Sequence, residues 1–195
     1  MAALLADGPK YAAILAGTRL SFAAPKDLTQ LVVVERLAGT PTTDFGAPSV
    51  APTADSDRSC DAAELKRFEK ILRAGWRAFD QVVSSAHGKT LATGPRGGGR
   101  ALEGIVAHVI GADAGYLTAV GWKAPKAAEP AEQVTTTREA ILAALKASAT
   151  GEIPSQGPRG GVRWSARYFV RRVAWHLMAH VWEIERRAAT RTNQG

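Results

Sequence analysis

The strongest constraint on the fold is the helical spacing of apolar residues in four segments after residue 60. These segments cover about 61–88, 99–120, 136–151 and 164–188. Within each one, apolar side chains return every three or four residues, which gives a helix one apolar face. Several such helices joined by linkers bury those faces against one another. The sequence therefore predicts a mostly α protein, a four-helix bundle over 59–190, followed by a tail at 191–195.

Polar residues mark where two of these helices start. Asp61 is followed three residues later by Glu64, the spacing of an N-terminal capping box. Thr136 and Glu139 repeat the pattern and predict that the third helix begins there. Between the second and third helices the proline-bearing stretch 123–133 predicts a connection.

Residues 1–58 differ from the rest in character and predict a small N-terminal α/β appendage. Residues 1–16 are typical of a short helix, and the β-branched run at 29–37 is typical of a strand. The Gly-, Pro- and Ser-rich stretch 39–58 predicts a surface loop. Because one strand is not a stable sheet, we expect it to pack on the bundle or to pair with another chain, as in a homodimer.

Composition narrows the class of protein. The chain has 195 residues, is 46% apolar and carries a net charge of +7. No apolar run approaches the ~20 residues that span a bilayer, and the N-terminus fits a secretory signal poorly because no basic residue precedes Lys10. Cys60 is the single cysteine, which excludes an intramolecular disulfide. We therefore expect a cytoplasmic protein without a membrane partner.

The chain has four histidines, three of which fall on predicted apolar faces. His176 and His180 are four residues apart, so they lie one turn apart on one helix face. That face is the apolar stripe of the fourth helix. His108 lies on the corresponding stripe of the second helix. His87, next to a helix end, is interpreted as structural.

Three imidazoles facing a bundle interior are costly unless they are hydrogen-bonded or bound to a metal. A three-histidine site with an open fourth position is typical of catalytic metal centres. The alternative is three core histidines bonded to backbone or tyrosine groups.

Two charged residues flank the predicted histidine face. Glu183 falls 20° from His176 on a helical wheel. It is a candidate for accepting a hydrogen bond from a metal-binding histidine, or for acting as a general base. Arg172 lies on the same flank and is a candidate for holding a substrate carboxylate. For both residues a surface ion pair is the alternative.

Two segments resemble the DinB/YfiT-like superfamily. They are ALEGIVAHVIGADAGYL (101–117) and RYFVRRVAWHLMAHVWEIERR (167–187), and TTDFGAP (42–48) resembles a subgroup of bacterial relatives. The resemblance implies a four-helix bundle with a long connection between the second and third helices. It also implies a divalent cation bound by His108, His176 and His180, with water completing the shell.

This resemblance implies chemistry as well as fold. Some members of the superfamily are thiol-dependent transferases or isomerases that use mycothiol or bacillithiol. The imidazole ligands favour zinc or nickel, with manganese as a third candidate. The expected function is metal-dependent activation of a water or a low-molecular-weight thiol against a small-molecule substrate. That function places the chain among hydrolases or thiol-dependent S-transferases and isomerases.

A second hypothesis rests on charge. Between Gly157 and Arg191 there are eight arginines and two acids, which supply +6 of the net charge. This patch favours a non-catalytic basic module for nucleic acid or an acidic partner. However, the arginines fan around the outer side of the predicted helix, so we expect only weak, non-specific DNA binding. The glycine-rich repeats at 94–100 and 157–163 are candidate anion sites or shared helix-entry turns.

Overall fold

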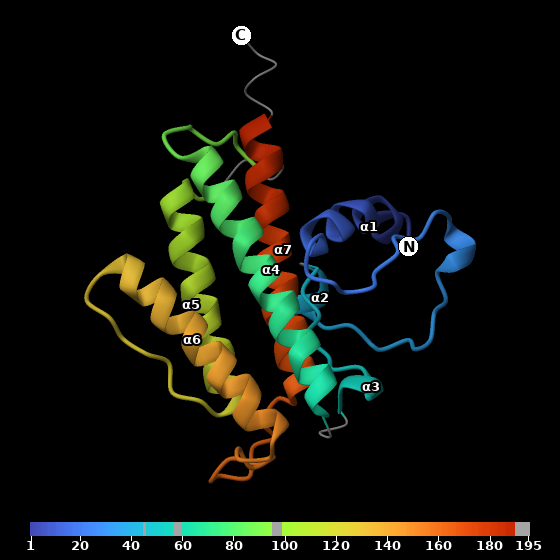
Figure 1. Cartoon of the computed structure of the whole chain (residues 1–195), viewed down its shortest axis with the longest axis vertical. Coiled ribbons are helices and arrows are strands. Elements are labelled where there is room, and N and C mark those ends of the chain that lie inside the picture. Colours follow the sequence, from blue (N-terminus) through green and yellow to red (C-terminus); the bar gives the residue numbers. More distant parts are fainter. Residues whose placement is uncertain (45, 57–59, 95–98, 190–195) are drawn as a thin grey trace.

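The computed structural model describes residues 1–44, 46–56, 60–94 and 99–189, and most of them are helical (Figure 1). The helices are α1 (Ala2–Leu15), α2 (Pro41–Asp44), α3 (Thr53–Ser56), α4 (Ala62–Ala86), α5 (Leu102–Val120), α6 (Pro130–Ala149) and α7 (Ala166–Ala189). A 3₁₀ turn, η1 (Leu28–Gln30), follows α1. No helix within these described ranges combines the length and apolarity needed to cross a membrane. The predicted tail at 191–195 lies outside the described residues.

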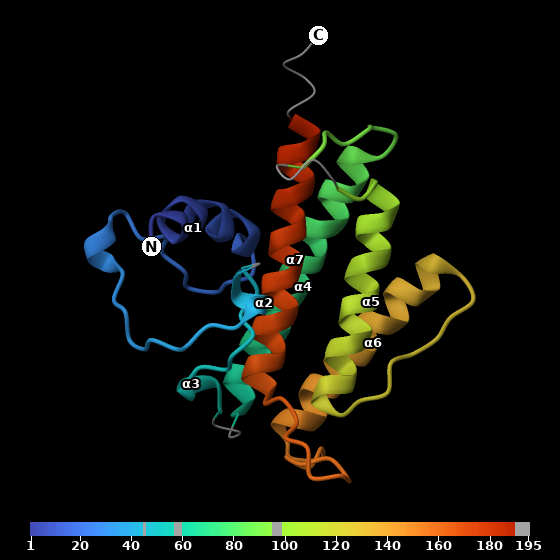
Figure 2. The same cartoon turned by 180° about the vertical axis from the view of Figure 1, so that it is seen from behind.

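Helices α4 to α7 form the bundle that the apolar spacing predicts. Helices α4 and α7 run side by side although they are far apart in the sequence, and α5 and α6 lie on one flank of this pair (Figures 1 and 2). The side chains at its centre are fully buried, among them Leu72, Ile105, Leu117, Ile141, Leu145, Phe169 and Leu177. Burying these apolar faces is the main favourable contribution to folding.

Gly75 lies at the contact between α4 and α7. A Cβ atom at Gly75 would lie 3.3 Å from Met178 Cε and 3.4 Å from Leu177 Cδ1. A side chain there would require Met178 and Leu177 of α7 to move by a few tenths of an ångström. Since α7 carries two of the histidines, this contact helps to fix their position.

The predicted start of α4 is confirmed, whereas the predicted start of the third bundle helix is wrong. Asp61 accepts a hydrogen bond from the Glu64 amide at 2.7 Å and caps α4. Helix α6 begins at Pro130, six residues before Thr136. Proline at the first position needs no hydrogen-bond acceptor for its nitrogen and has a helical φ. Thr136 lies inside the helix, where its hydroxyl donates to the Glu132 carbonyl at 2.9 Å.

The connection between α5 and α6 is held by hydrogen bonds at both ends. Gly121 ends α5 with a φ of 94°, and the Trp122 amide donates to the Leu117 carbonyl at 2.8 Å. At the other end the Gln133 side chain accepts from the Ala127 amide at 2.9 Å and donates to the Pro125 carbonyl at 3.1 Å. The long connection is therefore held against the bundle by its own backbone groups.

The predicted strand at 29–37, and with it the α/β appendage, is wrong. Residues 28–30 form the turn η1, and no strand occurs anywhere in the described part of the chain. Residues 31–40 have neither helix nor ladder partner, and Val32 and Val34 are 78% and 92% exposed. β-Branched residues favour extended backbone, but a strand also needs a neighbour to accept its hydrogen bonds.

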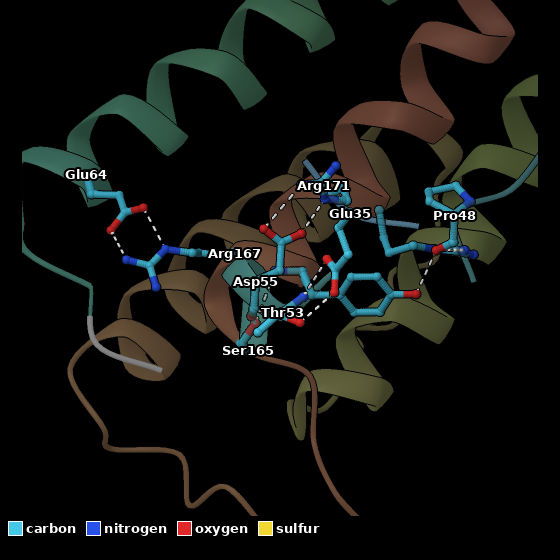
Figure 3. A network of polar contacts seen from close by, with 10 residues as sticks. Glu35, Pro48, Thr53, Asp55, Glu64, Ser165, Arg167 and Arg171 are labelled. Carbon is cyan, nitrogen blue, oxygen red and sulfur yellow. Dashed lines mark hydrogen bonds and ion pairs between the residues drawn. The ribbon is translucent and has the colours of Figure 1, made fainter. Parts of the chain in front are cut away.

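Residues further along this N-terminal segment are tied to α7 by polar contacts (Figure 3). The Tyr168 hydroxyl donates to the Pro48 carbonyl at 2.7 Å. The Asp55 carboxylate pairs with Arg171, and its carbonyl accepts from the Ser165 hydroxyl. The predicted loop at 39–58 thus contains two short helical turns, α2 and α3, and packs along the bundle.

Candidate metal centre

The three predicted ligands come together between α5 and α7. His176 Nε2 lies 3.2 Å from His108 Nε2 and 3.1 Å from His180 Nε2. One ring nitrogen from each of the three histidines lies within 4.8 Å of the other two. The cluster can therefore present three nitrogen atoms to one ion.

Helix geometry explains how the histidines meet. His176 and His180 are one turn apart on α7, and their ring centroids are 4.6 Å apart. His108 reaches them from α5, with its centroid 5.0 Å from that of His176. All three ring pairs are close to perpendicular, so their nitrogen edges converge instead of stacking face to face.

The nitrogen spacing fits a small divalent ion. Two nitrogen ligands of a tetrahedral zinc with bonds of about 2.05 Å lie about 3.3 Å apart. The observed Nε2 separations of 3.2 and 3.1 Å are close to that value. The three histidines therefore supply the nitrogen ligands that such an ion takes, and two of the three nitrogen pairs have this spacing, while the third pair lies within 4.8 Å.

Burial keeps two of the imidazoles in the form that binds metal. His176 is 6% exposed, and burial, followed by the neighbouring His180 and His108, lowers its pKa to about 3. Burial and then the positive charge of Arg100 lower the pKa of His108. Only a neutral imidazole has a free lone pair for a cation, so both rings are available at neutral pH.

Glu183 orients His180, the third histidine of the cluster. His180 Nδ1 lies 2.8 Å from Glu183 Oε2, so the N–H on Nδ1 donates to the carboxylate and the lone pair is left on Nε2. Burial raises the pKa of Glu183, but the hydrogen bonds from His180 and Arg187 outweigh it and the pKa is lowered overall. A carboxylate behind a ligating histidine is the usual support of a metal site.

Arg187 was not predicted by sequence reasoning, and it anchors Glu183. Its Nη1 donates to Glu183 Oε1 at 2.8 Å, while Nε and Nη2 donate to the carbonyls of Ala92 and Arg100 at 2.7 and 2.8 Å. The i, i+4 spacing of Glu183 and Arg187 was a usable signal for this pair. The two carbonyls belong to the segment that leads into α5. Contacts to backbone carbonyls cannot be predicted from the spacing of residues in the sequence.

Arg172 lies beside the cluster but is engaged with other groups. Its guanidinium lies 5.3 Å from the Tyr116 ring centroid and 5.6 Å from that of Trp175. Nη1 donates to the Pro48 carbonyl at 2.9 Å. The Tyr116 ring in turn lies 5.8 Å from His176. Arg172 therefore joins the N-terminal segment to the wall of the site.

The second glycine-rich repeat forms a closed turn. The Gly157 amide donates to the Gly161 carbonyl at 2.8 Å, and the Gly160 amide donates to the Gly157 carbonyl at 2.9 Å. These two amides are therefore not directed at an anion. Residues 95–98 of the first repeat lie outside the described residues.

No protein-family model, curated protein or solved structure matches this chain.

Proposed function

We propose that this chain is a divalent-metal-binding protein of the DinB-like type that activates a water or a low-molecular-weight thiol. The observation that carries the proposal is the convergence of three Nε2 atoms, two of them 3.1 and 3.2 Å from the third. A bound ion would supply Lewis acidity, which lowers the pKa of a water or thiol in contact with it. Three protein ligands leave a position for that group.

The chain's own residues would hold and orient the ion. His108, His176 and His180 supply neutral nitrogen donors. Glu183 fixes the tautomer of His180, and Arg187 fixes Glu183. Both carboxylate oxygens of Glu183 are engaged, which favours a positioning role over the role of general base.

The substrate is proposed to be a small electrophile, attacked by water in a hydrolase or by a thiol in an S-transferase or isomerase. The resemblance of 101–117 and 167–187 to the DinB superfamily favours the thiol. Low-molecular-weight thiols are kept reduced in the cytosol, so we propose a cytoplasmic activity. Two assays separate the classes, hydrolysis of an aryl ester and loss of mycothiol or bacillithiol in the presence of an aryl halide.

Metal analysis of protein prepared without a histidine tag tests the proposal directly. Elemental analysis should find close to one zinc, nickel or manganese ion per chain. His108→Asn and His176→Asn should each lose it, whereas His87→Asn, exposed at the end of α4, should retain it. Metal-free wild-type protein that takes up no ion on titration with Zn²⁺, Ni²⁺ or Mn²⁺ would refute the proposal.

The basic-module hypothesis receives less support from the arginines. Arg167 donates to Glu64 at 2.7 and 2.6 Å, and Arg171 pairs with Asp55. Arg172 and Arg187 face internal partners, as described above. Arginines engaged in this way are less available to phosphates. Sub-micromolar binding of a labelled duplex at about 0.15 M salt, with or without metal, would restore that hypothesis.

A further inference from the structure

A cavity lies within the bundle, apart from the histidine cluster. It has a volume of about 170 Å³ and is lined by α4, α5 and α6, with Leu177 as its lining residue from α7. None of the three histidines lines it. Most of its wall is apolar, and the side chains include Phe79, Val109 and Ile110.

Asp113 gives this cavity a buried acid. The residue is 4% exposed, and its Oδ1 atom is buried with no hydrogen-bond partner among the described residues. Burial raises the pKa of Asp113 to about 7, against a smaller lowering effect of Arg138. An unpaired carboxylate in an apolar wall is costly to the folded protein.

Trp76 adds an unpaired donor to the same wall. The residue is 5% exposed, lines the cavity and has a buried indole Nε1 with no partner in the part of the chain described. The indole N–H can only donate and an ionised carboxylate can only accept. The cavity thus presents two unpaired polar groups of opposite kind.

An ion pair lies where the lining reaches the surface. Arg138 donates to both oxygens of Asp80 at 2.8 and 2.6 Å, and the Asp80 side chain is 56% exposed. Among the residues that the structure describes, the charged ones that line the cavity are Asp80, Asp113 and Arg138. When all three are ionised they leave one net negative charge, which one cation balances.

We propose that this cavity binds a small organic cation, a one-ring or branched-alkyl primary ammonium that donates to Asp113. A cavity of about 150 Å³ accepts benzene, so the space suits one ring with a short side chain. The apolar part of the ligand fills the cavity between α4, α5 and α6, and its ammonium donates a hydrogen bond to Asp113 Oδ1. An acceptor atom on the ligand would also satisfy the Trp76 indole.

Benzylamine and benzyl alcohol are a matched pair of probes, since they have the same ring and differ in charge. Calorimetry at pH 8, with metal removed by a chelator, should show benzylamine binding at least about tenfold more tightly, the value of a charge-assisted hydrogen bond. Asp113→Asn should remove that preference, while Asp7→Asn on α1 should keep it. Equal affinity for the two probes, or unchanged benzylamine affinity in Asp113→Asn, would overturn the proposal.

The NMR signal of the Trp76 indole N–H reports on binding in the cavity without a substitution at Asp113. The chain has five tryptophans, and Trp76→Phe identifies the indole N–H signal of Trp76. Benzylamine should shift that signal saturably in the wild-type protein. Binding should persist in His176→Asn, which separates this site from the proposed metal centre. Absence of a saturable shift at millimolar benzylamine would mean that the cavity holds water only, and would refute the proposal.

Discussion

Glu183 accepts a hydrogen bond from His180 at 2.8 Å, and this contact decides which nitrogen of His180 is offered to the other two histidines. With the proton held on Nδ1, the lone pair of Nε2 points toward His176, 3.1 Å away. The pair therefore links an ordinary intrahelical contact at i, i+3 to the metal-binding capacity of the cluster.

Removing this carboxylate should weaken metal binding in a graded way. Glu183→Ala should lower zinc affinity by about 10- to 100-fold, because the His180 tautomer is no longer fixed. Glu183→Gln retains an acceptor without the charge and should fall between wild type and Glu183→Ala. Competition with a chromophoric chelator measures the order. Glu185→Gln, exposed on the same helix, is the control, and equal affinities across the series would contradict the positioning role.

Saturating metal should stabilise the folded protein. At a Zn²⁺ concentration of about 100 times the dissociation constant, the free energy of unfolding should rise by about 2.7 kcal/mol if only the folded state binds. Urea titrations with and without Zn²⁺ measure the gain. His176→Asn should show no gain, because it removes the central donor of the cluster. A full gain in that variant would mean that the ion acts elsewhere.

Substitution of Gly99 by alanine should lower the free energy of unfolding more than the same substitution of Gly160, which also has a positive φ. A Cβ atom at Gly99, whose φ is 141°, would lie 2.7 Å from Arg187 Nη2. Gly160 has a φ of 77° and open space around it. Gly160→Ala should cost about 1 kcal/mol of unfolding free energy for backbone strain. Gly99→Ala should cost at least about 1 kcal/mol more and should weaken zinc binding, because displacement of Arg187 releases Glu183.

The raised pKa of Asp113 predicts a pH dependence of stability. Burial raises this pKa from 3.8 to about 7, so between these values the folded state holds a proton that the unfolded state has lost. The free energy of unfolding should therefore fall as pH rises through this window, by at most about 1.4 kcal/mol per pH unit from this group. Asp113→Asn removes the contribution.

Denaturation of the wild type and Asp113→Asn at several pH values measures this contribution. The stability of the variant relative to wild type should increase from about pH 4 to about pH 7 and stay level above it. A difference that does not change with pH would show that Asp113 titrates normally in the folded protein.

Arg172 should hold the N-terminal segment on the bundle. Its planar guanidinium lies against three aromatic rings and donates to the Pro48 carbonyl, a combination that lysine cannot reproduce. Arg172→Lys should therefore speed tryptic cleavage at Arg36. Arg73→Lys, exposed on α4, should not. Identical cleavage rates for both variants and the wild type would show that the segment is held by other contacts.

The sequence was sufficient to predict the four bundle helices, apart from the start of α6, and the helix faces that carry the three histidines, because both depend on local periodicity. One helical wheel places His176 and His180 on the buried face of α7, and the same reasoning places His108 on α5. The site residue that it missed, Arg187, binds the carbonyls of Ala92 and Arg100. Every residue has the same backbone carbonyl group, so the pattern of residue types does not indicate which carbonyl a side chain will bind.

Two errors arose where a local pattern competed with a second requirement. The valines at 32–34 favour extended backbone, yet without a neighbouring strand they remain a mostly exposed, unpaired segment. Thr136 and Glu139 match a capping box, but the same spacing also occurs inside helices. Pro130, which starts α6, was the stronger boundary signal because proline is favoured in the first turn of a helix and disfavoured in its interior.

The position of α7 in the chain has a consequence for biosynthesis. Every other helix of the bundle is translated before it, so α4 and α5 leave the ribosome without the partner that covers their apolar faces. His108 likewise has no partner in the cluster until α7 is synthesised. The other residues of the cluster and its support then follow within twelve residues, namely His176, His180, Glu183 and Arg187. A nascent chain paused before residue 176 therefore lacks the histidine cluster, and synthesis of one helix completes both the packing of the bundle and this cluster.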